Sequence, residues 1–198
     1  MTAQINDSFR HNDTEFSLSG ISEGELFEPS LLDLNPAGTC TACWRGYQAI
    51  FAVSNSHLVL DTLHVNLIAE GEGYEPQVGP QINGVTPTGT DGEFDWFNNH
   101  YEGLDYHLEY SGGLLITDGF IQDLYVHMGF HAAWKYKSVI ELIFANGILQ
   151  QEFDRSERMA EIRERMIQAR NEDVESKMPS DDEIHDFVER SFDRTYRM

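Results

Sequence analysis

The sequence contains one C-x-x-C motif, in which two residues separate Cys40 from Cys43. Two thiolates at this spacing can chelate zinc or cycle between dithiol and disulfide. A structural zinc site needs four ligands and there is no second C-x-x-C, so the other ligands would be histidines or carboxylates. A redox site of this kind normally opens a helix, whereas this motif leads into a predicted strand. We therefore expect two reduced structural cysteines, and no metal or cofactor.

A second pattern that could do chemistry is a pair of histidines, His127 and His131, with three residues between them. On a helix this spacing would place both imidazoles on one face, where they could share a metal ion. Gly129 lies between them and the preceding residues resemble a strand, on which the two side chains would stand ~13 Å apart. We expect histidines that form hydrogen bonds near a strand end, with His100 and His107 as further candidates.

Carboxylates between residues 91 and 105 are a third candidate site. Paired acids can perform general acid–base catalysis, and clusters of acids can bind calcium. The D-G-E at 91–93 lacks the ligand spacing of an EF-hand, and a glycosidase pair is defined by a distance that the sequence does not show. Because the chain has 34 acidic residues, close pairs arise by chance, and no catalytic residue is assigned. The candidate binding residues in this segment are Asp91, Glu93, Asp95, Glu102 and Asp105.

Several common motifs of nucleotide binding and metal-dependent catalysis are missing from the sequence. It contains no phosphate-binding loop of the Walker type, no G-x-G-x-x-G and no H-E-x-x-H. We therefore expect a protein that is not an enzyme.

Charge is distributed unevenly along the chain, whose formal net charge is −21. Residues 1–134 contain 19 acidic side chains and two cationic ones, Arg10 and Arg45, whereas residues 135–198 contain 15 acidic and 11 basic side chains. An acidic surface repels phosphate backbones and anionic membranes, and it attracts cations and basic proteins. We expect no nucleic acid and no membrane among the partners, and the charge favours a basic protein.

Length and composition are those of an ordinary globular protein. The 198 residues fit one domain with an appendage, or two small domains, and aromatic residues make up 12% of the chain. The N-terminal segment has neither the charged region nor the apolar region of a signal peptide. No apolar run approaches the ~20 residues that cross a bilayer. We expect a cytoplasmic protein.

The first strong secondary-structure signal predicts a β-hairpin. Residues 44–53 and 57–67 both alternate in the manner of strands, and the S-N-S at 54–56 has the chemistry of a turn. Residues 1–35 are polar and acidic, and we interpret them as a loosely structured lead-in. Residues 69–95 are rich in glycine, proline, threonine and acids, which is typical of a long surface loop.

A second group of strands is predicted between residues 94 and 153. Apolar and polar residues alternate around Tyr106, Gly112-Gly113 closes that segment, and residues 114–128 continue the strand pattern. Asn146-Gly147 then favours the positive φ angles of a type I′ turn, so we predict another hairpin there. The alternative, a helix over 138–153, would place a glycine in its interior at a cost of ~1 kcal/mol relative to alanine.

The character of the chain changes after Asp154, where apolar residues follow at helical intervals. Ser180 and Glu183 have the spacing of a capping box that opens a second helix. We predict that this helical pair, through residues such as Phe187 and Phe192, packs onto the β body or forms a homo-oligomer interface.

Together these segments predict an α+β protein, with a lead-in over 1–35, a β-rich and largely antiparallel body over 36–153, and C-terminal helices over 154–198. The segments TACWRGYQAIF and YVHMGF resemble a set of small uncharacterised bacterial proteins that share a W-R-G-Y strand and a Y-V-H-M-G-[YF] segment before a terminal hairpin. The resemblance covers about residues 31–153. It supports the β-rich body and implies no activity.

Two hypotheses of function follow from these patterns. In the first, the chain is a non-enzymatic binding protein, comparable to an immunity protein or antitoxin, whose acidic body meets a basic protein partner. In the second, it is a small-ligand binder or an enzyme with a site in a β-rich pocket, which draws on Tyr106, His127, His131 and the loop 70–93.

Overall fold

The computed structural model describes residues 2–69, 75–90, 96–172 and 181–197, and its main element is one eight-stranded sheet. Neighbouring strands are antiparallel except for β1 and β3, which run parallel. This confirms the prediction of a β-rich, largely antiparallel body. The strands are β1 (Ser8–His11), β2 (Thr14–Ile21), β3 (Tyr47–Ser54), β4 (His57–Val65), β5 (Asn99–His107), β6 (Gly112–Phe120), β7 (Tyr136–Ala145) and β8 (Ile148–Asp154).

Two α-helices follow the last strand, as the sequence predicts. They are α1 (Ser156–Glu172) and α2 (Asp181–Phe192), and three short 3-10 helices lie earlier, η1 (Pro29–Leu32), η2 (Gln122–Leu124) and η3 (Ala133–Lys135). Only the first half of α1 packs against the sheet, because Met159 is buried whereas Met166 is 50% exposed. None of the helices in the described residues has the length and apolarity to cross a membrane.

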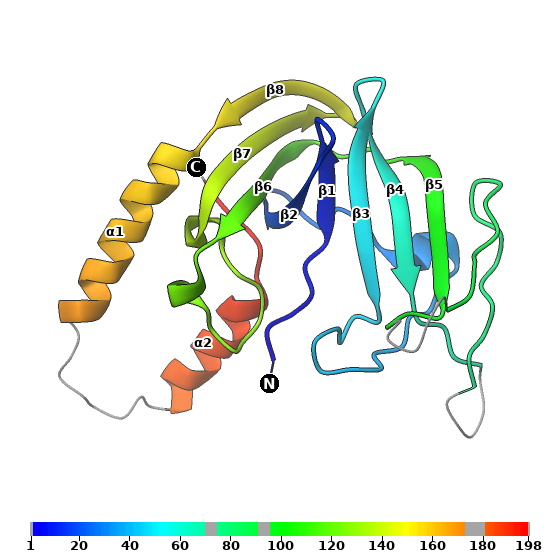
Figure 1. Cartoon of the computed structure of the whole chain (residues 1–198), viewed down its shortest axis with the longest axis horizontal. Helices are drawn as coiled ribbons and strands as arrows, with labels where there is room; N and C mark the ends of the chain where they lie inside the picture. Colours follow the sequence, from blue (N-terminus) through cyan, green and yellow to red (C-terminus); the bar gives the residue numbers. More distant parts are fainter. Residues whose placement is uncertain (1, 70–74, 91–95, 173–180, 198) are drawn as a thin grey trace.

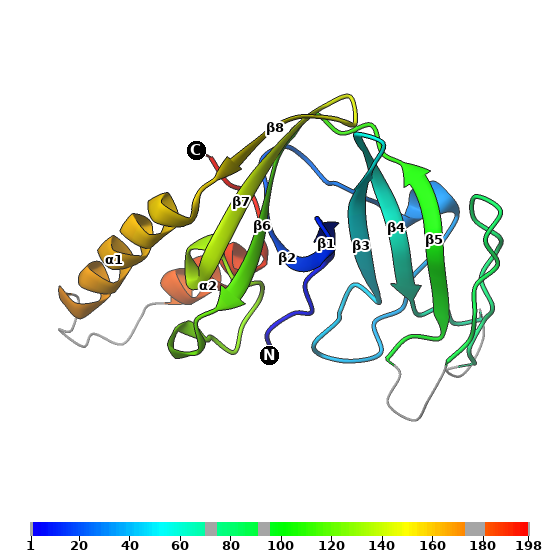
Figure 2. The ribbon, with the colours of Figure 1, turned by 45° about the horizontal axis from the view of Figure 1, so that its top comes forward.

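The sheet closes on itself. Its order is β3-β1-β2-β6-β7-β8-β4-β5, and β3 also pairs with β4, so the strands other than β5 form a ring. The seam between β8 and β4 is short: one residue pair, His57 with Ile148, and flanking backbone hydrogen bonds. Figures 1 and 2 show β6, β7 and β8 on the same flank as the helices, β3, β4 and β5 on the other, and the β1–β2 hairpin between them.

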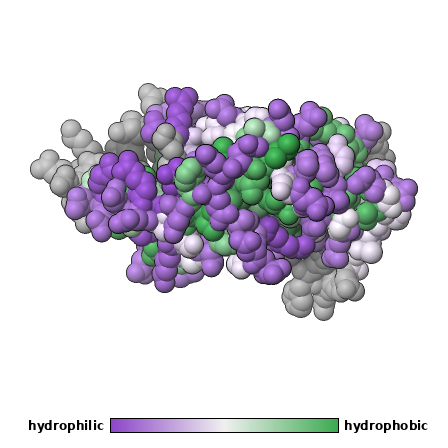
Figure 3. Space-filling view, turned by 90° about the horizontal axis from the view of Figure 1, so that it is seen from above, coloured by the Kyte–Doolittle hydropathy of each residue, from purple (hydrophilic) through white to green (hydrophobic). Residues whose placement is uncertain are grey.

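The interior of this ring is filled with side chains. Phe9, Leu18, Phe51, Leu60 and Tyr101 are among the largest residues that are fully buried, and they belong to one continuous apolar cluster. Figure 3 shows that hydrophobic side chains also gather in the middle of the face seen from above, between hydrophilic margins. The cluster therefore fills the ring, and the cavity described below lies outside this cluster.

Both predicted hairpins are confirmed. In the first, β3 and β4 pair along their whole length, and Asn55 and Ser56 have positive φ angles in the turn. In the second, β7 and β8 pair across Asn146 and Gly147, whose φ angles are 49° and 75°. These angles are those that a tight turn between twisted antiparallel strands requires.

The long connection between β4 and β5 lies along the outer edge of β5. The Tyr101 hydroxyl donates to the Pro80 carbonyl, and the backbone groups of Thr88 and His100 pair with each other. This covers the edge of a strand that would otherwise offer free hydrogen-bonding groups. The prediction of a surface loop is therefore confirmed for its described part; Asp91, Glu93 and Asp95 lie outside the described residues.

The interpretation of residues 1–35 as a loosely structured lead-in was wrong. They contain β1 and β2, which pair with β3 and β6 in the centre of the sheet, and Phe9 and Leu18 are fully buried. The reason is a tight turn at Asn12 and Asp13, both with positive φ, which lets two short strands pair locally.

Two smaller predictions were also wrong: that Gly112-Gly113 closes a strand, and that the strand pattern continues to residue 128. Strand β6 begins at Gly112 and ends at Phe120, so the glycine pair opens this strand, and residues 121–132 form a loop that contains η2. The loop is held from outside the sheet, because the backbone N–H of Phe130 donates to the carbonyl of Ser191 at the end of α2.

At the start of α1, the Asp154 side chain accepts the backbone N–H of Ser156. The capping box predicted for the second helix begins at Ser180, which lies outside the described residues.

Candidate functional site

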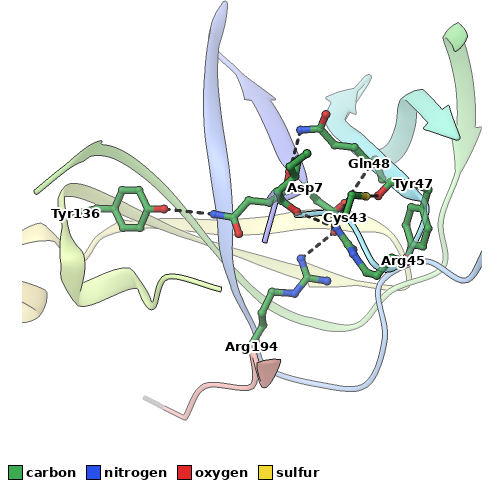
Figure 4. Close-up of polar contacts among 10 residues, drawn as sticks. Asp7, Cys43, Arg45, Tyr47, Gln48, Tyr136 and Arg194 are labelled. Carbon is green, nitrogen blue, oxygen red and sulfur yellow. Dashed lines mark hydrogen bonds and ion pairs between the residues drawn. The ribbon is translucent and has the colours of Figure 1, made fainter. Parts of the chain in front are cut away.

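A buried carboxylate, Asp7, joins three distant parts of the chain just before β1 (Figure 4). Arg45 donates to both of its oxygens, from Nη1 to Oδ2 at 2.9 Å and from Nη2 to Oδ1 at 3.1 Å. Arg194, near the C-terminus, donates to Oδ2 at 2.8 Å. The backbone N–H of Ala49 donates to Oδ1 at 3.0 Å, which anchors the carboxylate to β3.

The ionisation of this cluster follows from its neighbours. Burial alone would raise the pKa of Asp7, but the guanidinium groups of Arg45 and Arg194 outweigh burial and hold this pKa below its usual value. Burial would also lower the pKa of Arg45, and the Asp7 carboxylate raises it instead. Asp7 is therefore ionised, and this one carboxylate faces two guanidinium groups, which stay protonated in proteins, so the cluster keeps a net positive charge.

Aromatic rings hold the two arginines and the end of α2 in place. The Arg45 guanidinium lies 4.7 Å from the centre of the Tyr47 ring, and that of Arg194 lies 4.7 Å from the centre of the Phe130 ring. Trp44 stacks on Phe192 at 5.5 Å. The prediction that the second helix packs onto the β body is confirmed at Phe192; packing between two copies of the chain through these helices stays a prediction.

The last described residues, 193–197, form an extended segment that we call the C-terminal strap. It lies along the end of β2, where the N–H of Ile21 donates to the Arg194 carbonyl and the N–H of Tyr196 donates to the Ile21 carbonyl. The Tyr196 hydroxyl donates to Glu141 Oε1 at 2.8 Å, and Arg155 forms an ion pair with Glu141 Oε2 at 2.6 Å. The strap is thus fixed at both its backbone and its tyrosine.

Two glycines make room for the tyrosine of the strap. A Cβ atom at Gly113 would overlap the Tyr196 hydroxyl, and one at Gly20 would lie 2.9 Å from Tyr196 Cδ1. Burial, together with the neighbouring Glu141 carboxylate, raises the pKa of Tyr196, so the phenol stays protonated and keeps donating its hydrogen bond.

A cavity of about 220 Å³ lies between the sheet, the loop after β6, the two helices and the strap. Its apolar wall is formed by residues of β6, α1 and the segment around η3, and its polar wall by residues of α2 and the strap. The lining residues are Ser19, Leu115, Phe130, His131, Ala132, Ala133, Trp134, Met159, Ile162, Arg190, Asp193, Arg194, Thr195, Tyr196 and Arg197.

Among the sequence-based candidates that the structure describes, His131 alone lines this cavity. Burial and the nearby Lys135 ammonium lower its pKa to about 4, so the imidazole is neutral at neutral pH. Lys135 Nζ donates to Nδ1 at 3.4 Å, which places the ring proton on Nε2. Nε2 is buried and has no hydrogen-bond partner among the described residues.

The other candidates are not brought to this cavity. His127 is exposed and contacts the Tyr125 ring, which also contacts His131, so the two histidines flank one tyrosine. The strand-end location expected for them was wrong, because both lie in the loop after β6. The remaining described candidates lie on β5, on the opposite flank of the molecule (Figure 1); they are His100, Glu102, Asp105, Tyr106 and His107.

Cys40 and Cys43 occupy a turn that holds the N-terminal segment. The N–H of Cys43 donates to the Cys40 carbonyl, and the residues between them accept hydrogen bonds from Gln4 and Ile5. Burial raises the pKa of Cys43, which keeps its thiol protonated and poorly nucleophilic. Both cysteines are free thiols, and the turn leads into β3 as the sequence predicts.

Potential metal ligands gather at one place in the described part of the chain, at His185, Asp186 and Glu189 on α2. All three side chains are exposed and face solvent on one helix surface, so we assign no metal site to them. Neither the cysteine pair nor the loop histidines belong to this group.

One motif that sequence analysis overlooked is G-x-S-x-G, present as G-I-S-E-G at residues 20–24. A nucleophile elbow needs a turn from a strand directly into a helix. Here the residues after β2 form a bend, and the Ser22 hydroxyl accepts the backbone N–H of Gly113 at 2.7 Å. The motif therefore has a structural role, since it ties the end of β2 to the start of β6.

Comparisons of the chain with known protein families, curated proteins and solved structures found no match.

Sequence analysis missed most residues of this site. The sequence-based candidates did not include Trp134, Met159, Arg194 or Tyr196, which line this cavity. The signal that could have found them is indirect: Gly20 and Gly113 lie inside strands, where glycine often marks close approach of another segment.

Proposed function

We propose that this chain is a binding protein for a small organic molecule, held in the cavity between the sheet and the C-terminal strap. The observation that carries the proposal is a cavity of about 220 Å³ whose lining combines apolar residues with polar residues of α2 and the strap. Ligand sites in proteins combine these features: apolar surface supplies affinity, and a few polar groups fix orientation.

The fixed position of the strap supports the proposal, because it means that part of the binding site is ordered without a ligand. The backbone and the Tyr196 hydroxyl hold the strap in place, and Arg194 is bound to a buried carboxylate. A wall that is ordered before the ligand arrives costs less entropy on binding than one that must be ordered at that moment.

Binding accounts for the residues around the cavity better than catalysis does. Ser19 is the one serine in the lining, and its hydroxyl is bound to Thr117 in a buried contact of 2.6 Å. No cysteine is among the described lining residues, and His131 contacts no hydroxyl there that it could activate. A nucleophile needs a base within hydrogen-bonding reach.

A fragment screen by ligand-observed NMR tests the proposal, with neutral, anionic and cationic compounds in equal numbers. Ala132 is exposed at the cavity, so Ala132→Trp should fill it, and Ala145→Trp, an exposed alanine at the end of β7, is the matched control. We expect hits that compete with one another and disappear only in Ala132→Trp. No hits, or hits that Ala132→Trp retains, would contradict the proposal.

A second candidate function, an acidic body that meets a basic protein, is favoured by one observation. Both cations of residues 1–134 are already paired, Arg10 with Asp61 and Arg45 with Asp7. Twelve other acidic side chains of this region are exposed, and none is in an ion pair with a described residue. Uncompensated charge of this kind speeds association with an oppositely charged partner.

The test of this second candidate is the rate of association with a basic partner isolated from the native host. The rate should fall steeply as salt rises, because exposed charges are screened beyond ~8 Å at physiological ionic strength. Glu102→Lys and Asp105→Lys should lower it more than Glu161→Lys and Glu164→Lys, which lie among arginines on α1. An association rate that does not change with salt would reject this candidate.

A further inference from the structure

The charge around the cavity is opposite to that of the rest of the protein. The formal net charge of the chain is −21, yet the cavity is lined by three arginines, Arg190, Arg194 and Arg197, and by one acid, Asp193. The Asp193 carboxylate is engaged by the backbone N–H of Thr195 at 2.7 Å. Arg190 is also paired with Asp186 on α2 at 3.9 Å, so the excess of positive charge on the polar wall comes from Arg194 and Arg197.

Arg194 is the best positioned of these arginines. Its side chain is only 12% exposed, one Nη group is bound to Asp7, and its guanidinium lies over the Phe130 ring. Asp7 does not cancel this charge, because Arg45 takes both of its oxygens as well. A guanidinium with several donors that is held rigidly by one of them still offers the others to an anion.

The apolar wall limits the other half of the ligand. Leu115, Trp134, Met159 and Ile162 supply hydrocarbon and aromatic surface, and a cavity of about 220 Å³ leaves little room beyond one small ring. For scale, a dry engineered cavity of about 150 Å³ binds benzene. A ring that carries one small charged group fits this volume.

We propose that the ligand of this cavity is a small organic anion, with a compact apolar body against Trp134 and Met159 and a carboxylate or similar group at the arginines of α2 and the strap. This inference rests on the proposed function and names the chemical class of its ligand. The acidic surface around the cavity repels anions, which weakens their binding. An anion would therefore bind well only if it also had an apolar part whose burial against the apolar wall stabilises the complex.

Variants of the two exposed arginines, Arg190 and Arg197, test whether the positive charge binds the ligand or has only a structural role. Arg190 and Arg197 are exposed, so their replacement by glutamine should leave the fold intact, whereas Arg194 belongs to the buried cluster around Asp7. The matched control is Arg158→Gln, an exposed arginine on α1 that pairs with Glu161 on the same helix.

The experiment measures the binding of benzoate, benzamide and benzylamine to the full chain, by chemical-shift titration. We expect benzoate to bind about tenfold more tightly than benzamide, and benzylamine more weakly than either. The double variant Arg190→Gln/Arg197→Gln should weaken benzoate severalfold and leave benzamide unchanged, and Arg158→Gln should change neither.

Two results would overturn the inference in distinguishable ways. If benzamide binds as tightly as benzoate, and the glutamine variants alter neither, then the site takes small molecules without regard to charge and only the anion inference fails. If none of the three compounds binds and the fragment screen is also empty, both the inference and the proposed function fail.

Discussion

The Arg194 guanidinium donates a hydrogen bond to the buried Asp7 carboxylate at 2.8 Å, which ties the C-terminal strap to the segment that opens the sheet. The contact joins residues 187 positions apart in the sequence. It also fixes one wall of the cavity, because the strap and the end of α2 line it together. The strap is therefore part of the folded body.

Asp7→Asn should strongly destabilise the protein. The variant keeps the shape of the side chain but leaves Arg45 and Arg194 facing each other without a counter-charge. Loss of one partner of a buried ion pair typically costs about 3–5 kcal/mol of unfolding free energy. Urea denaturation measures this loss. The control is Asp61→Asn, which breaks a partly exposed pair with Arg10 and should cost less than ~1 kcal/mol; equal losses would show that the Asp7 cluster has no special role.

Gly113→Ala tests the place of Tyr196 in the structure. The added methyl group would overlap the tyrosine hydroxyl, so we expect a loss of roughly 1–3 kcal/mol of unfolding free energy. In a Tyr196→Ala background the same substitution should cost much less, since the remaining close contact, Ile143 Cδ1 at 3.2 Å, is the end of a flexible side chain. A double-mutant cycle by urea denaturation measures the difference. An identical cost in both backgrounds would mean that Tyr196 does not occupy this position.

His131 should make stability depend on pH. Its pKa is lowered from 6.5 to about 4 in the folded chain, so between these values the unfolded chain binds a proton that the folded chain does not. The unfolding free energy should therefore fall as pH falls from 6.5 towards 4, by at most about 1.4 kcal/mol per pH unit from this group. Denaturation at pH 7, 6 and 5 should show a smaller slope for His131→Phe than for wild type, and equal slopes would contradict this prediction.

The cysteine pair should be indifferent to metal. With one thiol buried and no third ligand nearby among the described residues, a chelator should leave the melting temperature unchanged, and the purified protein should contain no stoichiometric zinc. Metal analysis and a thermal melt with and without chelator measure both. A content of about one zinc per chain would contradict this prediction and would assign a metal-binding role to the C-x-x-C.

The parts of the fold that the sequence predicts are those with a strong local signal. The turn at Asn146-Gly147 and the alternation of β3 and β4 are local properties, and both hairpins are present. Strand β1 has only four residues, and in β2 the apolar residues Phe16, Leu18 and Ile21 give a weak signal among polar neighbours. Their place in the sheet depends on pairing with β3 and β6, which no local pattern encodes.

The candidate site could not be predicted for a related reason. Asp7, Arg45 and Arg194 lie far apart in the sequence, and nothing in their neighbourhoods indicates that they meet. His131 was among the sequence-based candidates because it and His127 have a spacing that can bind a metal ion on a helix. In the structure His131 instead lines the cavity. The acidic segment from Glu102 to Asp105 attracted attention by composition alone, and it lies on the other flank.

The most direct measurement of the central claim uses the methyl group of Met159 as a probe inside the cavity. Met159 is buried and lines the cavity, while Met166 lies exposed further along the same helix. With methionine methyl groups labelled with carbon-13, a titration with benzoate should shift the Met159 signal in a saturable manner and leave the Met166 signal in place. A Met159 signal that does not move, or that moves in step with Met166, would contradict binding in this cavity.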